Sequence, residues 1–500
     1  MDTSQPKAEK RRPSRQARPG ATPQGRWLLN IIVIDGIIKK ISYDRRMKLR
    51  KLKLNFSTTH MIMISFLLGI FIGSILLSLP VSTADGKAVP YIDALFTATT
   101  SICVTGLVTL PTYSTWSVFG QIVILVMIQI GGLGIVTILS GILISFNRKF
   151  GLKDRILMQD AFNLNSLSGI VRFLKKVFKG TFLMEGIGAL LYMTVFVPEF
   201  GWKGIWYSVF NAISAFCNAG MDIISENSLC PYAVNPVVNL TTSLMVISGG
   251  IGYVVWWDMV AAVRNFRKKK FRSFAAMSLH SKIALTATAV LLVAGAAGFF
   301  IFEYNNPLTI GNMSLPDKIQ VSFFQSMTTR TAGFASVPQG DLTNTSAVFA
   351  LFLMFIGGSP VGTAGGVKTV TMAVFVFSAL AEIRGKEDFS LFRRRIPRQA
   401  ISKAVAVITV SFMIMFISTI LLSAVTNADL IDIAYETVSA TATVGLTRDL
   451  TPTLDIPGKI IIIVTMYLGR VGPISLLIAF NTKKKNQNII KDPEEKISIG

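Results

Sequence analysis

Four long runs without a charged side chain constrain this chain most strongly. Residues 60–79, 117–146, 283–302 and 404–425 contain no Asp, Glu, Lys or Arg. A helix of about 20 apolar residues crosses the hydrocarbon core of a bilayer. The composition agrees, because 51% of the 500 residues are hydrophobic and only 15% are charged, whereas soluble domains are about a quarter charged. These features exclude a soluble enzyme and a nucleic-acid-binding module, and they predict an all-α integral membrane protein.

The basic residues indicate how the chain is oriented in the membrane. Of the 50 Lys and Arg residues, 42 lie in residues 1–58, 147–180, 264–282, 384–403 and 481–500. These five segments alternate with pairs of apolar runs. Short loops rich in Lys and Arg stay on the cytoplasmic side. We therefore expect eight spans, a multi-pass location in the cell (plasma) membrane and both termini in the cytoplasm. The net charge of +23 then needs no nucleic-acid partner to explain it.

The N-terminal region has a different character. Residues 1–26 are rich in Pro, Gly and basic side chains, a composition typical of a disordered tail. Residues 27–38 are apolar but too short to span, and a basic run follows them. We expect them to form a helix at the cytoplasmic interface, against anionic membrane lipid.

A short segment that ends in glycine occurs four times. The copies are FTATTSICVTGL (96–107), FNAISAFCNAGM (210–221), FFQSMTTRTAGF (323–334) and YETVSATATVGL (435–446). Their glycines, Gly106, Gly220, Gly333 and Gly445, are 114, 113 and 112 residues apart. Ten residues before each glycine stands an aromatic residue: Phe96, Phe210, Phe323 and Tyr435. Four copies at nearly equal spacing favour a repeated membrane module over unrelated turns or helix-packing glycines.

Each predicted module consists of a span, a half-length helix, a glycine turn and a second span. We place the modules at residues 59–146, 177–264, 281–383 and 399–481, between an N-terminal region (1–58) and a C-terminal tail (482–500). A helix of ten to twelve residues covers about half a bilayer. The chain must then return to the outer surface as extended backbone, which is tolerated at that depth only if protein buries it or it lines a cavity.

Four such returns around one axis would form a pore lined by main-chain carbonyls. Rings of backbone carbonyls coordinate dehydrated K⁺ in selectivity filters, and glycine keeps side chains out of the pore. The predicted ion-binding carbonyls belong to Val104, Thr105, Gly106, Asn218, Ala219, Gly220, Thr331, Ala332, Gly333, Thr443, Val444 and Gly445.

The motifs TSICVTGL, FCNAGM, TTRTAGF and TATVGL, in this order, resemble those of the Trk/Ktr/HKT superfamily of potassium transporters. The resemblance covers residues from about 60 to 481 and is greatest to the Ktr-type membrane subunit. It implies eight transmembrane helices, arranged as four M1–P–M2 repeats (span, pore helix, span) around a pseudo-fourfold pore. In that family, glycine at all four positions accompanies potassium selectivity, and serine in the first repeat accompanies sodium permeation. Gly106 occupies that position here, whereas the long basic N-terminal extension departs from the family pattern.

The same resemblance implies a homodimer on a cytosolic ring of RCK-type nucleotide-binding subunits. K⁺ would be the transported ion and Na⁺ an activator. We expect no organic cofactor in this chain, which has no nucleotide-binding fingerprint of its own. Cys103, Cys217 and Cys230 have no metal-ligand spacing.

The apolar stretch 347–383 is 37 residues long, which as one helix would measure about 55 Å, more than a span needs. Its centre is GGSPVGTAGG (357–366), too rich in Gly and Pro to remain helical. We expect two half-helices joined by an intramembrane loop that faces the pore, a break that singles out the third module. The family has a gating loop at this place. The predicted gate consists of Gly357, Gly358, Gly362, Thr363, Gly365, Gly366, Lys368 and Arg470.

Three cations lie within apolar sequence, where a charged side chain is costly and usually functional. We expect Arg470 to project into the cavity below the filter and to favour a closed state; the alternative is an ion pair with Glu185 or Glu436. For Arg330 we expect a structural role that braces the filter segment. Lys368 belongs to the predicted gate, with snorkelling toward the cytoplasm as the alternative.

The sequence therefore predicts potassium uptake. A secondary transporter for another cation or small solute is the alternative, although such folds usually have two inverted halves rather than four copies of one motif. A membrane enzyme is the weakest hypothesis, because the predicted spans contain no nucleophile–base pair and no cluster of metal ligands.

Overall fold

The computed structural model describes residues 58–145, 151–161, 169–269, 275–385 and 389–473. The predicted N-terminal tail, the interfacial helix at 27–38 and the C-terminal tail lie outside these residues. Most of the described chain is helical. Its only strands there are β1 (Ser390–Leu391) and β2 (Arg394–Arg395), an antiparallel hairpin that pairs Ser390 with Arg395 and Leu391 with Arg394.

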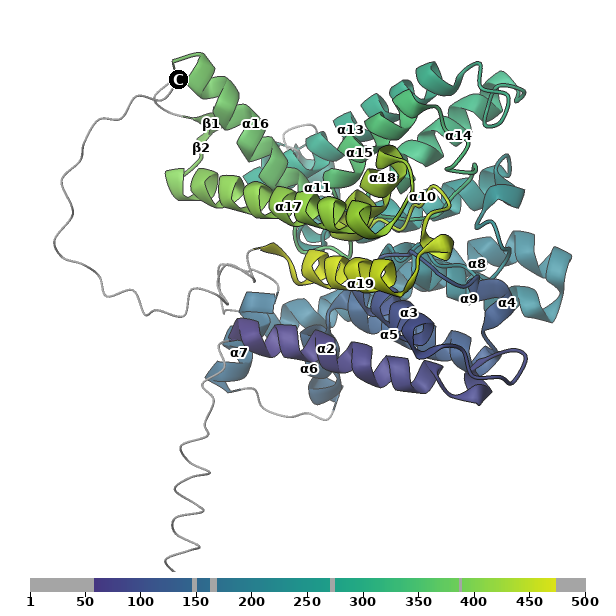
Figure 1. Ribbon diagram of the computed structural model, residues 1–500. Helices are drawn as coiled ribbons and strands as arrows, with labels where there is room; N and C mark the ends of the chain where they lie inside the picture. Colours follow the sequence, from purple (N-terminus) through teal and green to yellow (C-terminus); the bar gives the residue numbers. More distant parts are fainter. Residues whose placement is uncertain (1–57, 146–150, 162–168, 270–274, 386–388, 474–500) are drawn as a thin grey trace, which may run out of the picture. The chain divides into compact units, whose positions relative to one another are not determined.

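The main helices follow one another in four groups of the same order: a long helix, a short helix and a second apolar helix (Figure 1). The groups are α2 (Thr58–Leu77), α3 (Tyr91–Cys103) and α5 (Val118–Leu133); α8 (Ile170–Phe200), α9 (Trp202–Cys217) and α10 (Pro236–Gly250); α13 (Leu279–Glu303), α14 (Leu315–Thr328) and α15 (Asn344–Phe355); and α17 (Arg398–Val425), α18 (Leu430–Ala442) and α19 (Ile456–Val471). Between them lie α4 (Thr112–Thr115), α6 (Ile135–Ser145), α7 (Leu152–Ala161), α11 (Tyr253–Lys269), α16 (Thr369–Ile383) and the 3-10 turns η1 (Pro80–Ser82), η2 (Cys230–Tyr232) and η3 (Thr451–Thr453).

Helix packing links the four groups in a closed circuit. Each short helix packs against the long helix of its own group. It also packs against the second helix of the preceding group. The pairs are α5 with α9, α10 with α14, α15 with α18, and α19 with α3. The last pair returns to the first group, so the four short helices are held on the inside of the circuit.

The four long helices have the length and surface of membrane spans. Among the described residues, α2, α8, α13 and α17 are long and apolar enough to cross a bilayer, and the bent pair α10–α11 would make a fifth. They leave Phe71, Leu190, Val293 and Phe416 more than half exposed, which a soluble protein would avoid. The fold is therefore that of a helical, multi-pass membrane protein. The layout of eight spans stays a prediction.

The second helix ends at a break in each of the first three groups, so the expectation that a break singles out the third is wrong; in the fourth group the residues after Pro473 lie outside the described part of the chain. Helix α5 stops before Gly134, whose φ is +85°, and the apolar run 117–146 is not one continuous helix. Helices α10 and α11 meet at an angle of 104° across Gly252 (φ +92°), and α19 ends before Gly472 (φ +83°). A sequence signal marks these breaks: GGLG (131–134), GGIG (249–252), GGSP (357–360) and GRVG (469–472).

The first glycine of these motifs brings the second helix against the end of the short helix. A Cβ on Gly131 would overlap the carbonyl oxygen of Ile102. A Cβ on Gly249 or Gly469 would overlap that of Phe216 or Thr441, respectively. Because each carbonyl lies four residues before a repeated glycine, the close approach fixes where each short helix ends. In the third group, a Cβ on Gly357 would instead meet the carbonyl of Gly365 in the connecting loop.

We predict that Gly131→Ala destabilises the protein by about 1–3 kcal/mol, the usual cost of overpacking a close contact. The measurement is the midpoint of thermal unfolding in detergent. The matched control is Gly186→Ala in the middle of α8, where a Cβ meets nothing within 4 Å and alanine favours the helix. Equal midpoints for the two variants would contradict the close approach.

Candidate ion-conduction site

Each short helix is followed by the same backbone turn. The residue two positions before each repeated glycine has a left-handed backbone conformation, with positive φ. These residues are Val104 (φ 54°), Asn218 (φ 60°), Thr331 (φ 63°) and Thr443 (φ 52°). The glycines also have positive φ, at 102° for Gly106, 64° for Gly220, 83° for Gly333 and 98° for Gly445. For a residue other than glycine, this conformation has an energetic cost of about 1 kcal/mol or more. Its occurrence at four equivalent positions indicates a turn that the surrounding structure holds in place.

The four glycines meet around one axis. A Cβ placed on one of them would meet the carbonyl oxygen of the residue that precedes the glycine of the next group. From Gly106 it would lie 2.6 Å from Ala219 O, from Gly220 2.6 Å from Ala332 O, from Gly333 2.5 Å from Val444 O, and from Gly445 it would overlap Thr105 O. The circuit closes on itself and leaves no room for a side chain. The structure thus brings together the residues predicted to form the filter.

Hydroxyl side chains of the short helices hold the turns, a feature that the sequence analysis missed. Thr100 Oγ1 accepts from Gly106 N at 2.9 Å, and Ser439 Oγ accepts from Gly445 N at 3.0 Å. In the second group, Ser214 Oγ donates to Met221 O at 2.5 Å. These residues lie six positions before their glycines, a regularity that is visible in the sequence.

The third group is one residue shorter at this point. Thr328 Oγ1 donates to Phe334 O at 2.6 Å, and Thr328 lies only five positions before Gly333. Its buried aromatic residue is Phe324, whereas Phe323 is 37% exposed. The match of Phe323 to the other three aromatic residues is therefore wrong by one position, because the helix face that packs inward follows Phe324 and Thr328.

Several buried polar atoms at these turns have no hydrogen-bond partner within the described residues. They are the hydroxyls of Thr105, Thr331 and Thr443 and the amide nitrogen of Asn218, one from each group. Buried polar groups in native proteins are nearly always satisfied. These four groups are therefore available to bind water.

The predicted intramembrane loop lies against the break in the second group. Helix α15 ends at Phe355 and α16 begins at Thr369. In between, Ser359 N donates to Gly250 O at 2.8 Å and Thr363 N donates to Gly249 O at 3.1 Å. The loop thereby binds carbonyls that the end of α10 leaves without helical partners. Irregular backbone is tolerated at membrane depth only where protein buries it in this way or where it lines a cavity. A Cβ on Gly358 or Gly362 would lie 2.7–2.8 Å from one of these carbonyl oxygens, so the glycines permit the approach.

The other side of the loop contacts two filter turns. Thr363 Oγ1 lies 2.9 Å from Asn218 Oδ1 and 3.0 Å from Phe216 O. A Cβ on Gly365 would overlap the hydroxyl of Thr443. At the loop's ends, Gly357 and Gly366 pack against each other, with 3.0 Å from a Cβ on Gly366 to Gly357 Cα. The predicted gate residues therefore lie directly beside the second and fourth filter segments.

All three cations that lie within apolar sequence bind carbonyls of the loop at 357–366. Lys368 Nζ donates to Ala364 O at 2.5 Å and to Gly365 O at 3.4 Å, so it turns back onto the loop and does not snorkel. Arg470 donates from Nη1 to Thr363 O at 2.8 Å and from Nη2 to Gly131 O at 2.5 Å. Arg470 thus connects the loop to the end of α5.

The carboxylates considered as partners of Arg470 are engaged elsewhere. Glu185 accepts from Gln129 Nε2 at 2.9 Å, and Glu436 accepts from the hydroxyls of Thr447 and Thr451. The alternative of an ion pair is therefore wrong. The third cation, Arg330, donates from Nη2 to Gly357 O at 3.1 Å and from Nη1 to Thr288 O at 3.4 Å. It braces the third turn against α13 and the loop.

One carboxylate follows the second glycine turn, on the side predicted to face outward. Asp222 follows Gly220 by two residues, in the loop between α9 and α10, and is 8% exposed. Burial raises the pKa of Asp222 to about 6, against the opposing effect of hydrogen bonds from Ile224 N and the Ser228 hydroxyl. The carboxyl group is therefore neutral in mildly acidic solution and charged above about pH 6.

A closed circuit of helices around four glycine turns, with long apolar helices around it, is the arrangement of a helical membrane protein. The family model described as TrkH, cation transport protein, matches residues 30–491. The chain belongs to this family of cation transport proteins, which are not enzymes. The superfamily resemblance drawn from the glycine motifs is thereby confirmed.

Curated relatives match nearly end to end. The chain is 41% identical over 446 residues to the Ktr system potassium uptake protein B of Bacillus subtilis (strain 168), covering 89% of this chain and 97% of that protein. It is 37% identical over 460 residues to the potassium/sodium uptake protein NtpJ of Enterococcus hirae, covering 90% and 99%. The crystal structure of the potassium transporter TrkH from Vibrio parahaemolyticus has the same fold, with a TM-score of 0.68 at 16% identity over 86% of each chain.

We predict that the apparent affinity for a transported cation rises severalfold between pH 5 and pH 7.5. Over this range Asp222 loses its proton, and a negative charge beside the outer side of the ring attracts cations. The measurement is the KM for Rb⁺ uptake into proteoliposomes across this pH range. Asp222→Asn should abolish the change, and Asp85→Asn, which removes an exposed outer carboxylate, should retain it. The same pH dependence in Asp222→Asn as in the wild type would contradict this role.

Proposed function

We propose that this protein takes up potassium across the cell membrane through a selectivity filter of backbone carbonyls. The filter is formed by the carbonyls of residues 104–106, 218–220, 331–333 and 443–445, on the axis of four M1–P–M2 repeats. The observation that carries this proposal is the closed circuit of contacts among Gly106, Gly220, Gly333 and Gly445. A dehydrated K⁺ replaces its water shell with such carbonyls.

Two further observations support potassium as the substrate. The relatives in Bacillus subtilis and Vibrio alginolyticus are named potassium uptake proteins. The C-terminal ends of α3, α9 and α18 lie at the ring, and helix C-termini carry a partial negative charge that favours cations. A secondary transporter for another cation or small solute remains the rival hypothesis.

Rubidium uptake by the purified protein in liposomes tests the proposal. We expect uptake that excess K⁺ competes away and that an unrelated solute does not affect. Uptake that requires a cosubstrate gradient, or that K⁺ leaves unchanged, would favour the secondary transporter. One relative, in Enterococcus hirae, is named a potassium/sodium uptake protein. The assay should therefore include Na⁺, both as a competitor of Rb⁺ and as an activator of uptake.

The gate is proposed to be the loop at 357–366, held closed by Arg470 and Lys368. The loop contacts the Asn218 and Thr443 turns, and both cations bind its carbonyls. Positive charge directly beside the filter opposes the passage of K⁺. Opening would then require Arg470 to release Thr363 or Gly131.

The remaining proposals come from the resemblance. They are a homodimer, a cytosolic ring of RCK-type regulatory subunits, and cytoplasmic termini. The basic cytoplasmic loops would serve the contact with this ring, although the topology of the chain already accounts for their charge. The mass of the solubilised complex tests the dimer, and a mass equal to one chain would refute it.

Recovery of a nucleotide-binding subunit with the tagged protein tests the ring, and failure of such a subunit to copurify would refute the ring.

We predict that Gly106→Ser admits sodium. A Cβ at this position would lie 2.6 Å from Ala219 O and 3.1 Å from Gly445 Cα, so serine must displace the ring that sets the spacing of the carbonyls. The measurement is the inhibition of Rb⁺ uptake by Na⁺, which should become severalfold stronger. Gly86→Ser is the matched control, because Gly86 also has positive φ but nothing within 4 Å. Unchanged discrimination in Gly106→Ser would count against the filter.

We predict that Arg470→Ala raises Rb⁺ uptake severalfold in liposomes that contain no other protein. The substitution removes the hydrogen bonds to Thr363 O and Gly131 O and the positive charge next to the filter. The thermal midpoint of the variant shows whether it is folded. A folded variant with wild-type flux would exclude Arg470 from the gate.

A further inference from the structure

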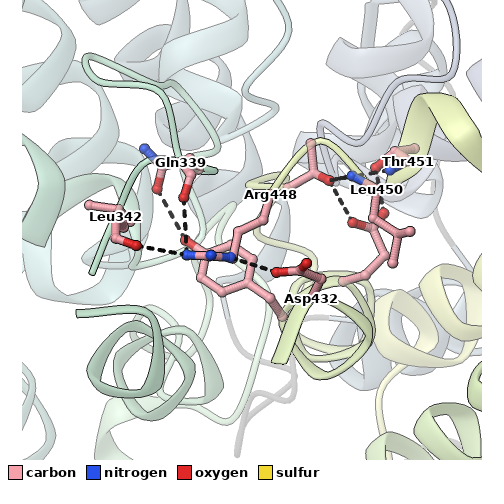
Figure 2. A network of polar contacts seen from close by, with 9 residues as sticks. Gln339, Leu342, Asp432, Arg448, Leu450 and Thr451 are labelled. Atoms are coloured by element: carbon pink, nitrogen blue, oxygen red, sulfur yellow. Dashed lines mark hydrogen bonds and ion pairs between the residues drawn. The ribbon is translucent and has the colours of Figure 1, made fainter. Parts of the chain in front are cut away.

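On the outer side of the ring, one guanidinium connects the third and fourth repeats. Arg448 follows Gly445 by three residues, and its side chain is 10% exposed. Its Nε donates to Asp432 Oδ1 at 2.7 Å, and its Nη1 donates to Leu342 O at 3.1 Å and to Gln339 O at 3.4 Å. Figure 2 shows Arg448 between Asp432 on one side and Gln339 and Leu342 on the other.

The partner in the third repeat is itself held in place. The side chain of Gln339 is buried, and its amide pairs with that of Gln325 on α14 at 2.6 and 3.2 Å. Gln339 Oε1 also accepts from the hydroxyl of Tyr435 at 3.0 Å. Tyr435 is the one tyrosine among the four repeated aromatic residues, and phenylalanine could not make this bond. The contact is therefore particular to the boundary between the third and fourth repeats.

The partner in the fourth repeat is equally fixed. Asp432 and Glu436 both belong to α18, the short helix that ends at this filter turn. Glu436 is fully buried and binds the hydroxyl of Thr447 at 2.7 Å and that of Thr451. Thr447 Oγ1 in turn accepts from Leu450 N at 3.2 Å. The segment that carries Arg448 is thus attached to α18 on both sides of Arg448.

A guanidinium is suited to this position because its donors point in several fixed directions within one plane. It can satisfy a carboxylate on α18 and two main-chain carbonyls of the third repeat at once. The turns that it connects are neighbours in the ring, since a Cβ on Gly333 would meet Val444 O. Selection between K⁺ and Na⁺ depends on how the carbonyls are arranged around the ion.

We propose that Arg448 is a positioning residue for ion selectivity: it holds the outer ends of the third and fourth filter segments at a fixed separation without contacting the ion. This role rests on the proposed potassium filter and adds a determinant outside the glycine motifs. Loss of the connection would let the two segments move apart or together, so that discrimination falls while conduction persists.

The test compares Arg448→Gln with the wild type in proteoliposomes, with Rb⁺ uptake as the flux and Na⁺ as the competitor. We expect Arg448→Gln to retain uptake, and Na⁺ to inhibit it at about tenfold lower concentration, the scale expected from losing a charge-assisted hydrogen bond. Arg448→Lys should remain impaired, because one ammonium cannot bind Asp432 and the third-repeat carbonyls together. Asp432→Asn, which is isosteric, should shift discrimination in the same direction and serves if Arg448→Gln fails to fold.

Lys318→Gln is the matched control. Lys318 is another buried cation of the outer side, but it donates to Tyr304 O at 2.8 Å within the third repeat. This variant should keep wild-type discrimination. Any of three results would overturn the proposal. They are wild-type discrimination against Na⁺ in Arg448→Gln, wild-type discrimination in Arg448→Lys, and a loss of discrimination in Lys318→Gln equal to that in Arg448→Gln. If the wild type itself takes up no Rb⁺, the potassium filter fails instead, and the two outcomes are distinguishable.

Discussion

The structure depends on how peptide groups are satisfied where no water is available. In the proposed arrangement of M1–P–M2 repeats, each short helix ends at membrane depth and leaves its last carbonyls and the next few residues without helical partners. Hydroxyls of Thr100, Ser214, Thr328 and Ser439 bind these segments from behind. In the proposed filter, the remaining carbonyls face the axis, and the same set of bonds that makes irregular backbone tolerable leaves main-chain oxygens to replace the water shell of a cation.

The loop at 357–366 follows the same rule in a different way. Its amides bind the carbonyls that α10 exposes at its break, and its own carbonyls are bound by Lys368 and Arg470. The loop is therefore held by groups from three other segments. None of these bonds is within a regular helix or sheet, so the loop can exchange them for water if an aqueous path opens. The proposed gate requires this exchange.

Sequence alone was sufficient for the features that repeat locally. The four glycines, their nearly equal spacing and the Gly-rich break in the third repeat are written in consecutive letters, and the structure brings the four glycines into contact. The GGLG and GGIG breaks carry a similar signal that the sequence analysis did not use. The partners of Arg470 and Arg448 could not be predicted, because Gly131, Thr363, Gln339 and Leu342 belong to other repeats. Their distances depend on how the helices pack, as does the one-residue offset that buries Phe324 rather than Phe323.

Anomalous diffraction from crystals grown in rubidium salt would test the central claim most directly. Four peptide segments that replace the hydration shell should place Rb⁺ on their common axis, in contact with main-chain oxygens from all four repeats. Density at that position, lost when K⁺ replaces Rb⁺ in the crystal, is the predicted result. An intact ring with no ion between the glycines, and Rb⁺ bound instead to side-chain carboxylates elsewhere, would contradict it.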